Sequence, residues 1–305
     1  MPRIVIVPRR QSNPIFVMFR DFHHGLLGPL AVETARLSSR LTVDIFGEYG
    51  QEPNVADQFW EEVRDGELRL VDLTHTLDHD SPYWPEDAPG SPFHTSVATT
   101  YQNDGNFTRN LGMPEHFGTH MDAPVHFCPG GTCVDRIAVE RLFAPAIVMD
   151  VRSAVMSNAD YRATAQDIEG WVGRHGAIPP GAVVFFQTGW AERWPSQEKY
   201  MNADVDGVLH FPGLSLEAAQ YLLDQARPVG IGIDTASVDY GPSTDCPVHR
   251  LTMPAGIYHL ENVANLDQLP ATGCSVIALP LKLAGGSGAP ARVIALIPTE
   301  PGIHD

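Results

Sequence analysis

The feature that most constrains this chain is the segment EHFGTHMDAPVHF, residues 115–127, in which four metal-capable side chains lie close together. All four occupy even positions, and an extended backbone would place them on one side because side chains alternate along a strand. A helix would instead turn the third away from the first two. The spacing therefore predicts a strand or an extended loop that carries His116, His120, Asp122 and His126.

These side chains can meet at one ion only if the backbone curls. A straight strand separates residues 116 and 122 by ~20 Å, whereas ligand atoms must all lie ~2.0–2.2 Å from the ion. Gly118 permits the unusual backbone angles of such a bend, and Pro124 stiffens the chain after Asp122. The segment is therefore predicted to form a metal-binding loop rather than a run of ordinary loop histidines.

Two imidazoles and one carboxylate leave coordination positions open for water, which is typical of a catalytic metal site rather than a closed structural one. A divalent ion lowers the pKa of bound water from about 15.7 to roughly 7, so hydroxide is available without a serine or cysteine nucleophile. His126 is then a candidate for moving protons. The segment GGSG, residues 285–288, lacks the Gly-x-Ser-x-Gly pattern of a nucleophilic serine, and we interpret it as a turn.

From residue 69 onward, short β-rich runs alternate with helical ones, which indicates an α/β domain over 69–305 with a largely buried sheet. The predicted strands are 69–76, 93–100, 145–151, 182–189, 229–234, 274–282 and 292–297, and the predicted helices are 134–143, 164–175 and 215–226. Residues 1–68 differ from the rest and are expected to form an N-terminal accessory extension with helices at 23–41 and 54–68. This extension can pack on the main domain or on a second subunit, and the sequence leaves both open.

The composition excludes two classes of partner. The net charge is −17 and no cluster of lysines or arginines relieves it, so nucleic acid is not expected. No run approaches the ~18 apolar residues of a membrane-spanning helix, so a membrane is not expected either. The four cysteines form no disulfide framework, and we find no signal peptide, which together predict a cytoplasmic protein with reduced thiols.

A second group of chemically capable residues lies in CPVHRLTMPAGIYHLEN, residues 246–262. His249 and Glu261 are twelve residues apart there, and His259 competes with His249 as a candidate ligand. The spacing alone does not distinguish these residues from ordinary surface residues.

The run from His116 to His126 resembles the His-x-Gly-Thr-His-x-Asp-x-Pro-x-His signature of the metal-dependent cyclase-type hydrolases, a family that includes bacterial kynurenine formamidase and isatin hydrolase. The resemblance covers roughly residues 69–298. Further matches are DLTHTLDHDSPYWPEDAP (72–89), QTGW (187–190), PGLSLEAAQYL (212–222), VGIGIDTASVD (229–239), HRLTMPAGIYHLEN (249–262) and ALPLKLAGGSGAPARVIAL (278–296).

The resemblance implies a single domain of the swivelling β/β/α type with a mixed sheet, assembled as a homodimer or homotetramer. It implies zinc or manganese, one or two ions per subunit. His116, His120 and Asp122 would bind the first ion, and His249 and Glu261 match positions that complete a second site in the formamidase branch. His126 matches a candidate general acid or base, and His249 is an alternative proton donor to the leaving group.

The expected activity is hydrolysis, by metal-activated water, of a small aryl formamide, an isatin-like lactam or a lactone. A cyclase or dehydratase that uses the same Lewis acid in secondary metabolism is the alternative, since nothing in the sequence excludes it. Trp84, Phe93 and Phe107 are aromatic candidates for the wall of the substrate pocket, with core packing as the other interpretation of each.

Overall fold

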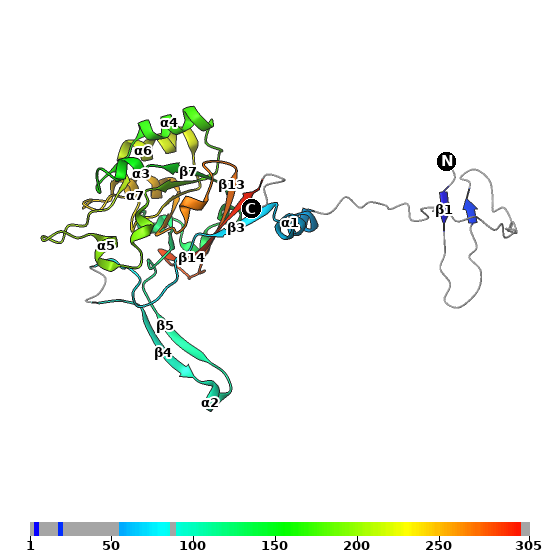
Figure 1. The fold of residues 1–305 in the computed structure, drawn as a ribbon, viewed down its shortest axis with the longest axis horizontal. Coiled ribbons are helices and arrows are strands. Elements are labelled where there is room, and N and C mark those ends of the chain that lie inside the picture. Colours follow the sequence, from blue (N-terminus) through cyan, green and yellow to red (C-terminus); the bar gives the residue numbers. More distant parts are fainter. Residues whose placement is uncertain (1–2, 6–17, 21–54, 86–89, 300–305) are drawn as a thin grey trace. The chain divides into compact units, whose positions relative to one another are not determined.

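The computed structural model describes residues 3–5, 18–20, 55–85 and 90–299, and the chain divides into two units, Met1–Glu52 and Pro53–Asp305. In the first unit, strand β1 (Arg3–Val5) pairs antiparallel with β2 (Met18–Arg20) (Figure 1). The helix predicted at 23–41 lies outside the described residues. In the second unit, the helix predicted at 54–68 is confirmed as α1 (Val55–Arg64).

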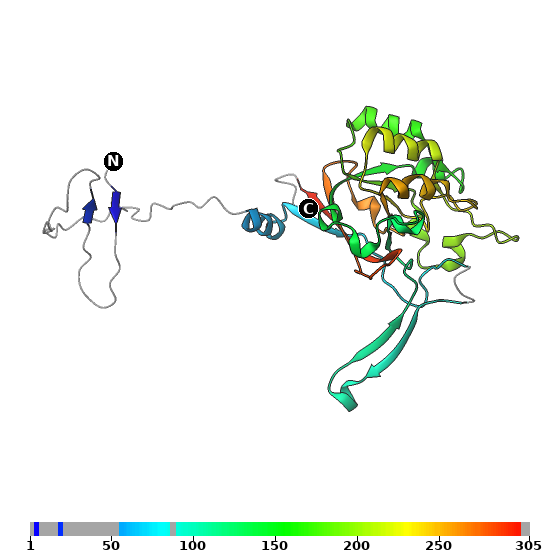
Figure 2. The same cartoon turned by 180° about the vertical axis from the view of Figure 1, so that it is seen from behind.

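The second unit is built around an eight-stranded sheet in the order β13-β7-β9-β11-β12-β6-β14-β3. Strand β13 also pairs with β14, which closes the sheet into a barrel-like ring (Figure 2). Four neighbouring strands are parallel and the others pair antiparallel, so the expected mixed sheet of an α/β domain is confirmed. The parallel strands are β7 (Phe143–Asp150), β9 (Val183–Gln187), β11 (Gly230–Ile233) and β12 (Tyr258–Glu261), and the others are β3 (Leu68–Asp72), β6 (His120–Asp122), β13 (Cys274–Pro280) and β14 (Gly288–Pro298).

Alternating side chains of the central strands feed two cores. Along β9, Val183 and Phe185 join a core to which strands from all around the ring contribute. Val184 and Phe186 point the other way and pack with residues of the helices α4 and α6. Every residue of β9 and β11 is buried, as expected for parallel strands covered on both faces.

The helices that cover the sheet begin where the sequence predicts. Helix α4 (Ala165–His175) starts with a capping box, in which the side chains of Thr164 and Asp167 each accept the other's backbone N–H. Helix α6 (Leu216–Tyr221) is capped by Ser215 and continues as a π-helical turn over Leu222–Ala226. The predictions of helices at 164–175 and 215–226 are therefore confirmed.

The prediction of one helix over 134–143 is wrong. The chain forms two 3-10 turns, Val134–Arg136 and Val139–Leu142, which are separated by extended backbone. Tertiary hydrogen bonds compete with a helix here, because Val134 N–H donates to the Gly286 carbonyl and the Arg141 guanidinium donates to the Val229 carbonyl. Local helical propensity is a weak preference that such contacts override.

A two-stranded hairpin leaves the body of the second unit (Figure 1). It consists of β4 (His94–Thr99) and β5 (Thr108–Gly112), with the short helix α2 (Tyr101–Asp104) between them. The strand predicted at 93–100 is thus confirmed, yet all residues of β5 are exposed. The remaining elements are α3 (Arg152–Val155), β8 (Arg162–Ala163), α5 (Gln197–Met201), β10 (Gly213–Leu214) and α7 (Pro247–Thr252). Within the part of the chain that the structure describes, no helix is long and apolar enough to span a bilayer.

Candidate metal centre

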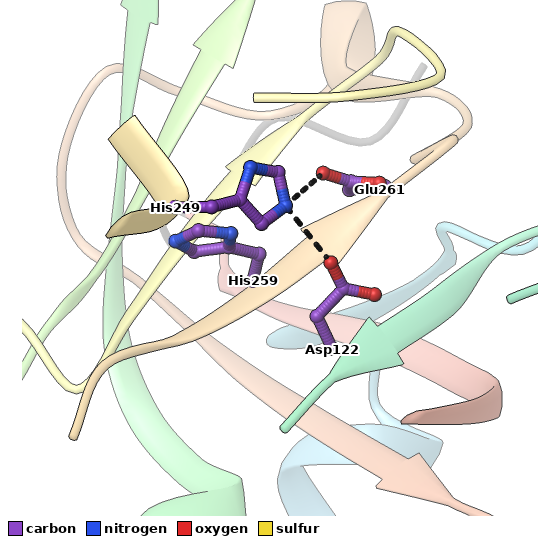
Figure 3. Close-up of side chains that lie close together, drawn as sticks. All are labelled: Asp122, His249, His259 and Glu261. Carbon is purple, nitrogen blue, oxygen red and sulfur yellow. Dashed lines mark hydrogen bonds and ion pairs between the residues drawn. The ribbon is translucent and has the colours of Figure 1, made fainter. Parts of the chain in front are cut away.

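Two neighbouring strands and one short helix bring the charged side chains of the site together (Figure 3). On β6, His120 and Asp122 are two residues apart and point to the same side, and both are buried. Strand β12 lies antiparallel beside β6, with Glu261 opposite His120. Helix α7 supplies His249, which lies between the carboxylates of Asp122 and Glu261, at 3.1 and 3.5 Å.

The predicted curl of the backbone is confirmed at Gly118. Its φ is +62°, and a Cβ atom there would lie 2.0 Å from Cδ2 of Leu77, so only glycine fits. The turn brings His116 back toward the strand, where its Nδ1 lies 2.7 Å from Oδ1 of Asp122. The chain leaves the site through the 3-10 turn Pro124–His126.

The hydrogen bonds of two imidazoles show which ring nitrogen of each faces the cluster. His120 Nδ1 donates to the Gly118 carbonyl at 2.8 Å, because a carbonyl oxygen only accepts. His249 Nδ1 is likewise held by the Asp239 carboxylate at 2.7 Å. The Nε2 atoms therefore face the cluster, each 3.1 Å from an oxygen of Asp122. At this distance a proton or a metal ion must lie between each nitrogen and the carboxylate, and this set of nitrogen and oxygen donors fits a divalent metal ion.

The electrostatics of the cluster favour positive charge at its centre. Burial opposes protonation of His120, but the carboxylates of Asp122 and Glu261 outweigh it and raise the pKa of His120 to about 9. The pKa of His249 is raised well above its ordinary value for the same reason, again against burial. Burial and the charge of Asp122 raise the pKa of Glu261. A divalent cation would supply the charge that these groups otherwise draw from protons.

Two sets of potential ligands share Asp122, and within each set the ligand atoms lie within 4.8 Å of one another. The first contains His116, His120 and Asp122, the residues that the sequence predicts for the first ion. The second contains Asp122, His249, His259 and Glu261, and thus brings together both residues predicted for a second ion.

His259, which sequence reasoning left as a competitor of His249, is fully buried beside it (Figure 3). The Thr252 hydroxyl donates to the Val248 carbonyl, so it accepts a hydrogen bond from His259 Nε2 at 2.8 Å. This leaves His259 Nδ1 as a buried lone pair without a partner among the described residues. Burial lowers the pKa of His259 well below its ordinary value, so the ring is neutral.

His126 lies beside the two sets without a direct hydrogen bond to them among the described residues. Its ring stacks on that of His116, with centroids 4.1 Å apart, and its centroid is 6.0 Å from that of His249. Burial lowers the pKa of His126 to about 4. Near neutral pH the ring is therefore uncharged and able to accept a proton.

The three aromatic residues predicted for the pocket wall lie in different places. Phe93 is buried and stacks on Phe117, the neighbour of His116, with centroids 5.6 Å apart. Trp84 is half-buried and packs edge-on against Phe211 in a separate aromatic cluster. Phe107 lies on the hairpin, 49 % exposed and stacked on Tyr101. Within one chain the structure thus brings only Phe93 next to a predicted ligand.

Sequence reasoning missed three residues that hold the histidines in place. Asp239 binds His249 and ends the run VGIGIDTASVD, six residues after the end of the buried strand β11. Ser287 lies 2.9 Å from His116 Nε2, and Glu115 lies 2.8 Å from Ser287. Ser287 belongs to the GGSG segment, whose short pattern gives no sign of a distant partner.

Comparison with known proteins places this site in a family. The family model Cyclase matches residues 71–240, which include all four residues of the signature segment. The chain belongs to the cyclase family. An isatin hydrolase of Roseibium aggregatum is 34 % identical over 247 residues, which is 76 % of this chain and 93 % of that relative.

Members of this family with other names are also similar to the chain. A kynurenine formamidase of Salinibacter ruber is 28 % identical over 239 residues, covering 77 % of this chain and 100 % of that relative. Among solved structures, isatin hydrolase A from Labrenzia aggregata bound to benzyl benzoate superposes with a TM-score of 0.75 and 37 % identity. That match covers 80 % of this chain and 99 % of the other, so the cyclase-family domain is present nearly in full.

Proposed function

We propose that this protein is a metal-dependent hydrolase that cleaves the amide C–N bond of an isatin-like lactam or an aryl formamide. The observation that carries the proposal is that His120 and His249 both direct Nε2 toward Asp122, each held by a hydrogen bond at Nδ1. Relatives named for both reactions match most of the chain. A lactone substrate, which was also expected, is retained for testing.

The residues divide into ligands and a proton carrier. His116, His120 and Asp122 would hold one ion, and His249 and Glu261 would hold a second together with Asp122. A bound divalent ion supplies Lewis acidity toward the carbonyl and lowers the pKa of water. Both nitrogens of His249 are already engaged, which favours its role as a ligand over its role as a proton donor.

His126 then remains as the proton carrier. Its neutral ring accepts a proton as water adds to the carbonyl carbon, and returns it to the nitrogen as the C–N bond breaks. The atoms balance, since one water is consumed and the products are a carboxylate, an amine and one proton that is released to solvent. Phe93, which packs against the neighbour of His116, is retained as the candidate for contact with an aryl substrate.

A metal and substrate panel tests this proposal. The full-length protein is stripped with a chelator, reloaded with Zn²⁺ or Mn²⁺, and assayed on aryl formamides, isatins and lactones, with product masses measured. Hydrolysis raises the substrate mass by one water, whereas the alternative cyclising dehydration lowers it by one. Full activity in a protein from which metal analysis detects no ion would refute the proposal.

The metal, the number of ions, the fold type and the location are also proposals. We propose zinc or manganese as the metal, with two ions per subunit because Asp122 is shared by two ligand sets. We propose the swivelling β/β/α type for the fold on the resemblance of the signature. The four free cysteines support a cytoplasmic location.

We also propose a homodimer or homotetramer. The hairpin supports this assembly, because an isolated two-stranded hairpin is marginally stable in water and this one exposes Val97, Phe107 and Leu111. Light scattering on the eluting protein measures its mass, and a single-chain mass at all concentrations would contradict the assembly.

A further inference from the structure

Two residues outside the predicted ligand set, Glu115 and Ser287, form a hydrogen-bonded chain that ends on a ligand. Ser287, which precedes strand β14, lies with its Oγ 2.9 Å from Nε2 of His116. The same Oγ lies 2.8 Å from Oε2 of Glu115, and the backbone N–H of Ser287 donates to that oxygen at 2.8 Å. Within the described residues, the carboxylate of Glu115 is thus linked by hydrogen bonds to the His116 ring through Ser287.

The direction of these hydrogen bonds follows from the chemistry of the end groups. The backbone N–H of Ser287 can only donate, so Oε2 of Glu115 accepts it, and as a carboxylate oxygen it also accepts the hydroxyl proton of Ser287. The hydroxyl proton of Ser287 therefore points to Glu115. Its lone pair then accepts the Nε2–H of His116, and His116 Nδ1 is left bare, 2.7 Å from Oδ1 of Asp122.

The carboxylate matters because a serine hydroxyl alone does not select a tautomer. It can donate to an imidazole nitrogen or accept from it. His116 also differs from His120 and His249, since it presents Nδ1 to the cluster where they present Nε2. This ring therefore needs a group at Nε2 that only accepts from it.

The backbone around Gly288 limits where the ring can lie. A Cβ atom at position 288 would be 2.5 Å from Cε1 and 2.9 Å from Nδ1 of His116, so the ring lies directly against the chain. A half-turn of the ring about its Cβ–Cγ bond would exchange the positions of its nitrogen and carbon atoms within this space. The hydrogen bond to Ser287, together with the contact between Nδ1 and Asp122, distinguishes the two orientations.

We propose that Glu115 and Ser287 are a positioning pair that fixes the tautomer and orientation of His116 and thereby directs its Nδ1 to the metal. The inference rests on the proposed function for the presence of the metal. It makes neither residue a catalytic one, because neither touches the reacting atoms.

The test uses full-length protein labelled with ¹⁵N at histidine and loaded with Zn²⁺, which is diamagnetic. Ring nitrogen spectra assign the metal-bound and protonated nitrogens of His116, whose signals are identified by their loss in His116→Asn. Zinc affinity is measured in parallel by chelator competition. The variants are Ser287→Ala, Glu115→Ala and Ser287→Thr, and the matched control is Ser157→Ala, an exposed serine whose hydroxyl binds only the carbonyl of Ala154.

The wild type is expected to bind zinc through Nδ1 of His116, with a proton on Nε2. Ser287→Ala should weaken zinc affinity roughly tenfold, the lower end of the range for lost outer hydrogen bonds to a metal ligand, and should broaden or split the His116 signals. Glu115→Ala should act in the same direction, Ser287→Thr should restore both readouts, and Ser157→Ala should change neither.

Wild-type zinc affinity together with unchanged His116 signals in Ser287→Ala would overturn the inference, as would binding of His116 through Nε2. Thermal unfolding shows which variants are folded. If Ser287→Ala is not, the comparison of Glu115→Ala with Ser287→Thr carries the test. A wild-type protein that binds no zinc or manganese would instead overturn the proposed function, so the two failures are distinguishable.

Discussion

His249 Nδ1 lies 2.7 Å from Oδ2 of Asp239, and this hydrogen bond turns the other ring nitrogen toward Asp122 and Glu261. The same carboxylate accepts the backbone N–H groups of Val248 and His249 in the first turn of α7. Asp239 therefore holds both the ring and the helix that carries it. A metal ligand whose second nitrogen is held by a carboxylate is a recurrent arrangement in metal sites.

Asp239→Asn should lower metal affinity about 10- to 100-fold, which is typical of lost outer partners. The amide keeps the shape of the carboxylate but provides only one accepting atom for three donors. Isothermal titration with Zn²⁺ and with Mn²⁺ measures the effect. Asp245→Asn, at an exposed position six residues after Asp239, is the matched control and should bind like the wild type. Equal affinities for both variants would contradict the role of Asp239.

His120→Ala should abolish both hydrolysis and metal retention. The imidazole is buried, and its Nε2 faces Asp122 and Glu261 at 3.1 and 3.6 Å, so its removal takes away one of the two imidazoles that contact both buried carboxylates. Elemental analysis of the purified protein reports the bound metal, and product formation reports the activity. His94→Ala, at an exposed histidine of the hairpin, should keep both. A His120→Ala protein that retains metal and activity would refute the assignment of this ligand.

Gly288→Ala should weaken metal binding and destabilise the fold. The new Cβ would lie 2.7 Å from the Met121 carbonyl as well as 2.5 Å from Cε1 of His116, and overpacking of this kind costs roughly 1–3 kcal/mol. Gly173→Ala in helix α4 is the control, since it has open space there and should gain up to about 1 kcal/mol from helical propensity. Urea unfolding should therefore give changes of opposite sign for the two variants.

His75 should make the stability of the fold dependent on pH in the acid range. Burial lowers its pKa from 6.5 to about 4, and its Nε2 has no partner among the described residues. Between these two values the unfolded chain binds a proton that the folded chain does not, so stability is full above pH 6.5 and falls as the pH decreases toward 4. At pH 5 the loss from this residue should be ~2 kcal/mol.

The variant His75→Phe isolates this effect, because a phenyl ring can keep the stacking on Trp194, whose centroid lies 4.2 Å away. Urea unfolding of the metal-free proteins at pH 7 and pH 5 measures the two free energies of unfolding. The wild type should lose ~2 kcal/mol more than the variant on acidification. His94→Phe, at an exposed position, should behave like the wild type, and parallel acid losses in all three proteins would contradict the prediction.

Local sequence patterns were sufficient to predict most of the helices and strands and the loop that carries the ligands. The even spacing of His116, His120 and Asp122 predicts an extended segment, and the structure forms it as β6 after a turn at Gly118. The capping residues Thr164 and Ser215 mark the starts of α4 and α6. These features depend on neighbours within a few residues, so they can be predicted from the sequence alone.

The pattern was insufficient wherever contacts between distant segments decide the outcome. The segment 134–143 loses its helix to hydrogen bonds with residues more than 80 positions away, such as that from Arg141 to Val229. Phe107 is aromatic, as a residue of a substrate pocket often is, yet it lies on the hairpin and is exposed to solvent. Neither result follows from the local letters, because both depend on which surfaces meet after folding.

The sequence by itself determined the type of chemistry, since two imidazoles and a carboxylate at fixed spacing can curl around one cation. Only the tertiary structure decided the protonation and the partners of those groups. The hydrogen bonds made by Asp239, Ser287 and Glu115 join residues 10 to 172 positions apart in the sequence. They select which nitrogen of each ring faces the cluster. A tautomer is set by the acceptor that a ring nitrogen meets, and that acceptor exists only once the sheet has closed.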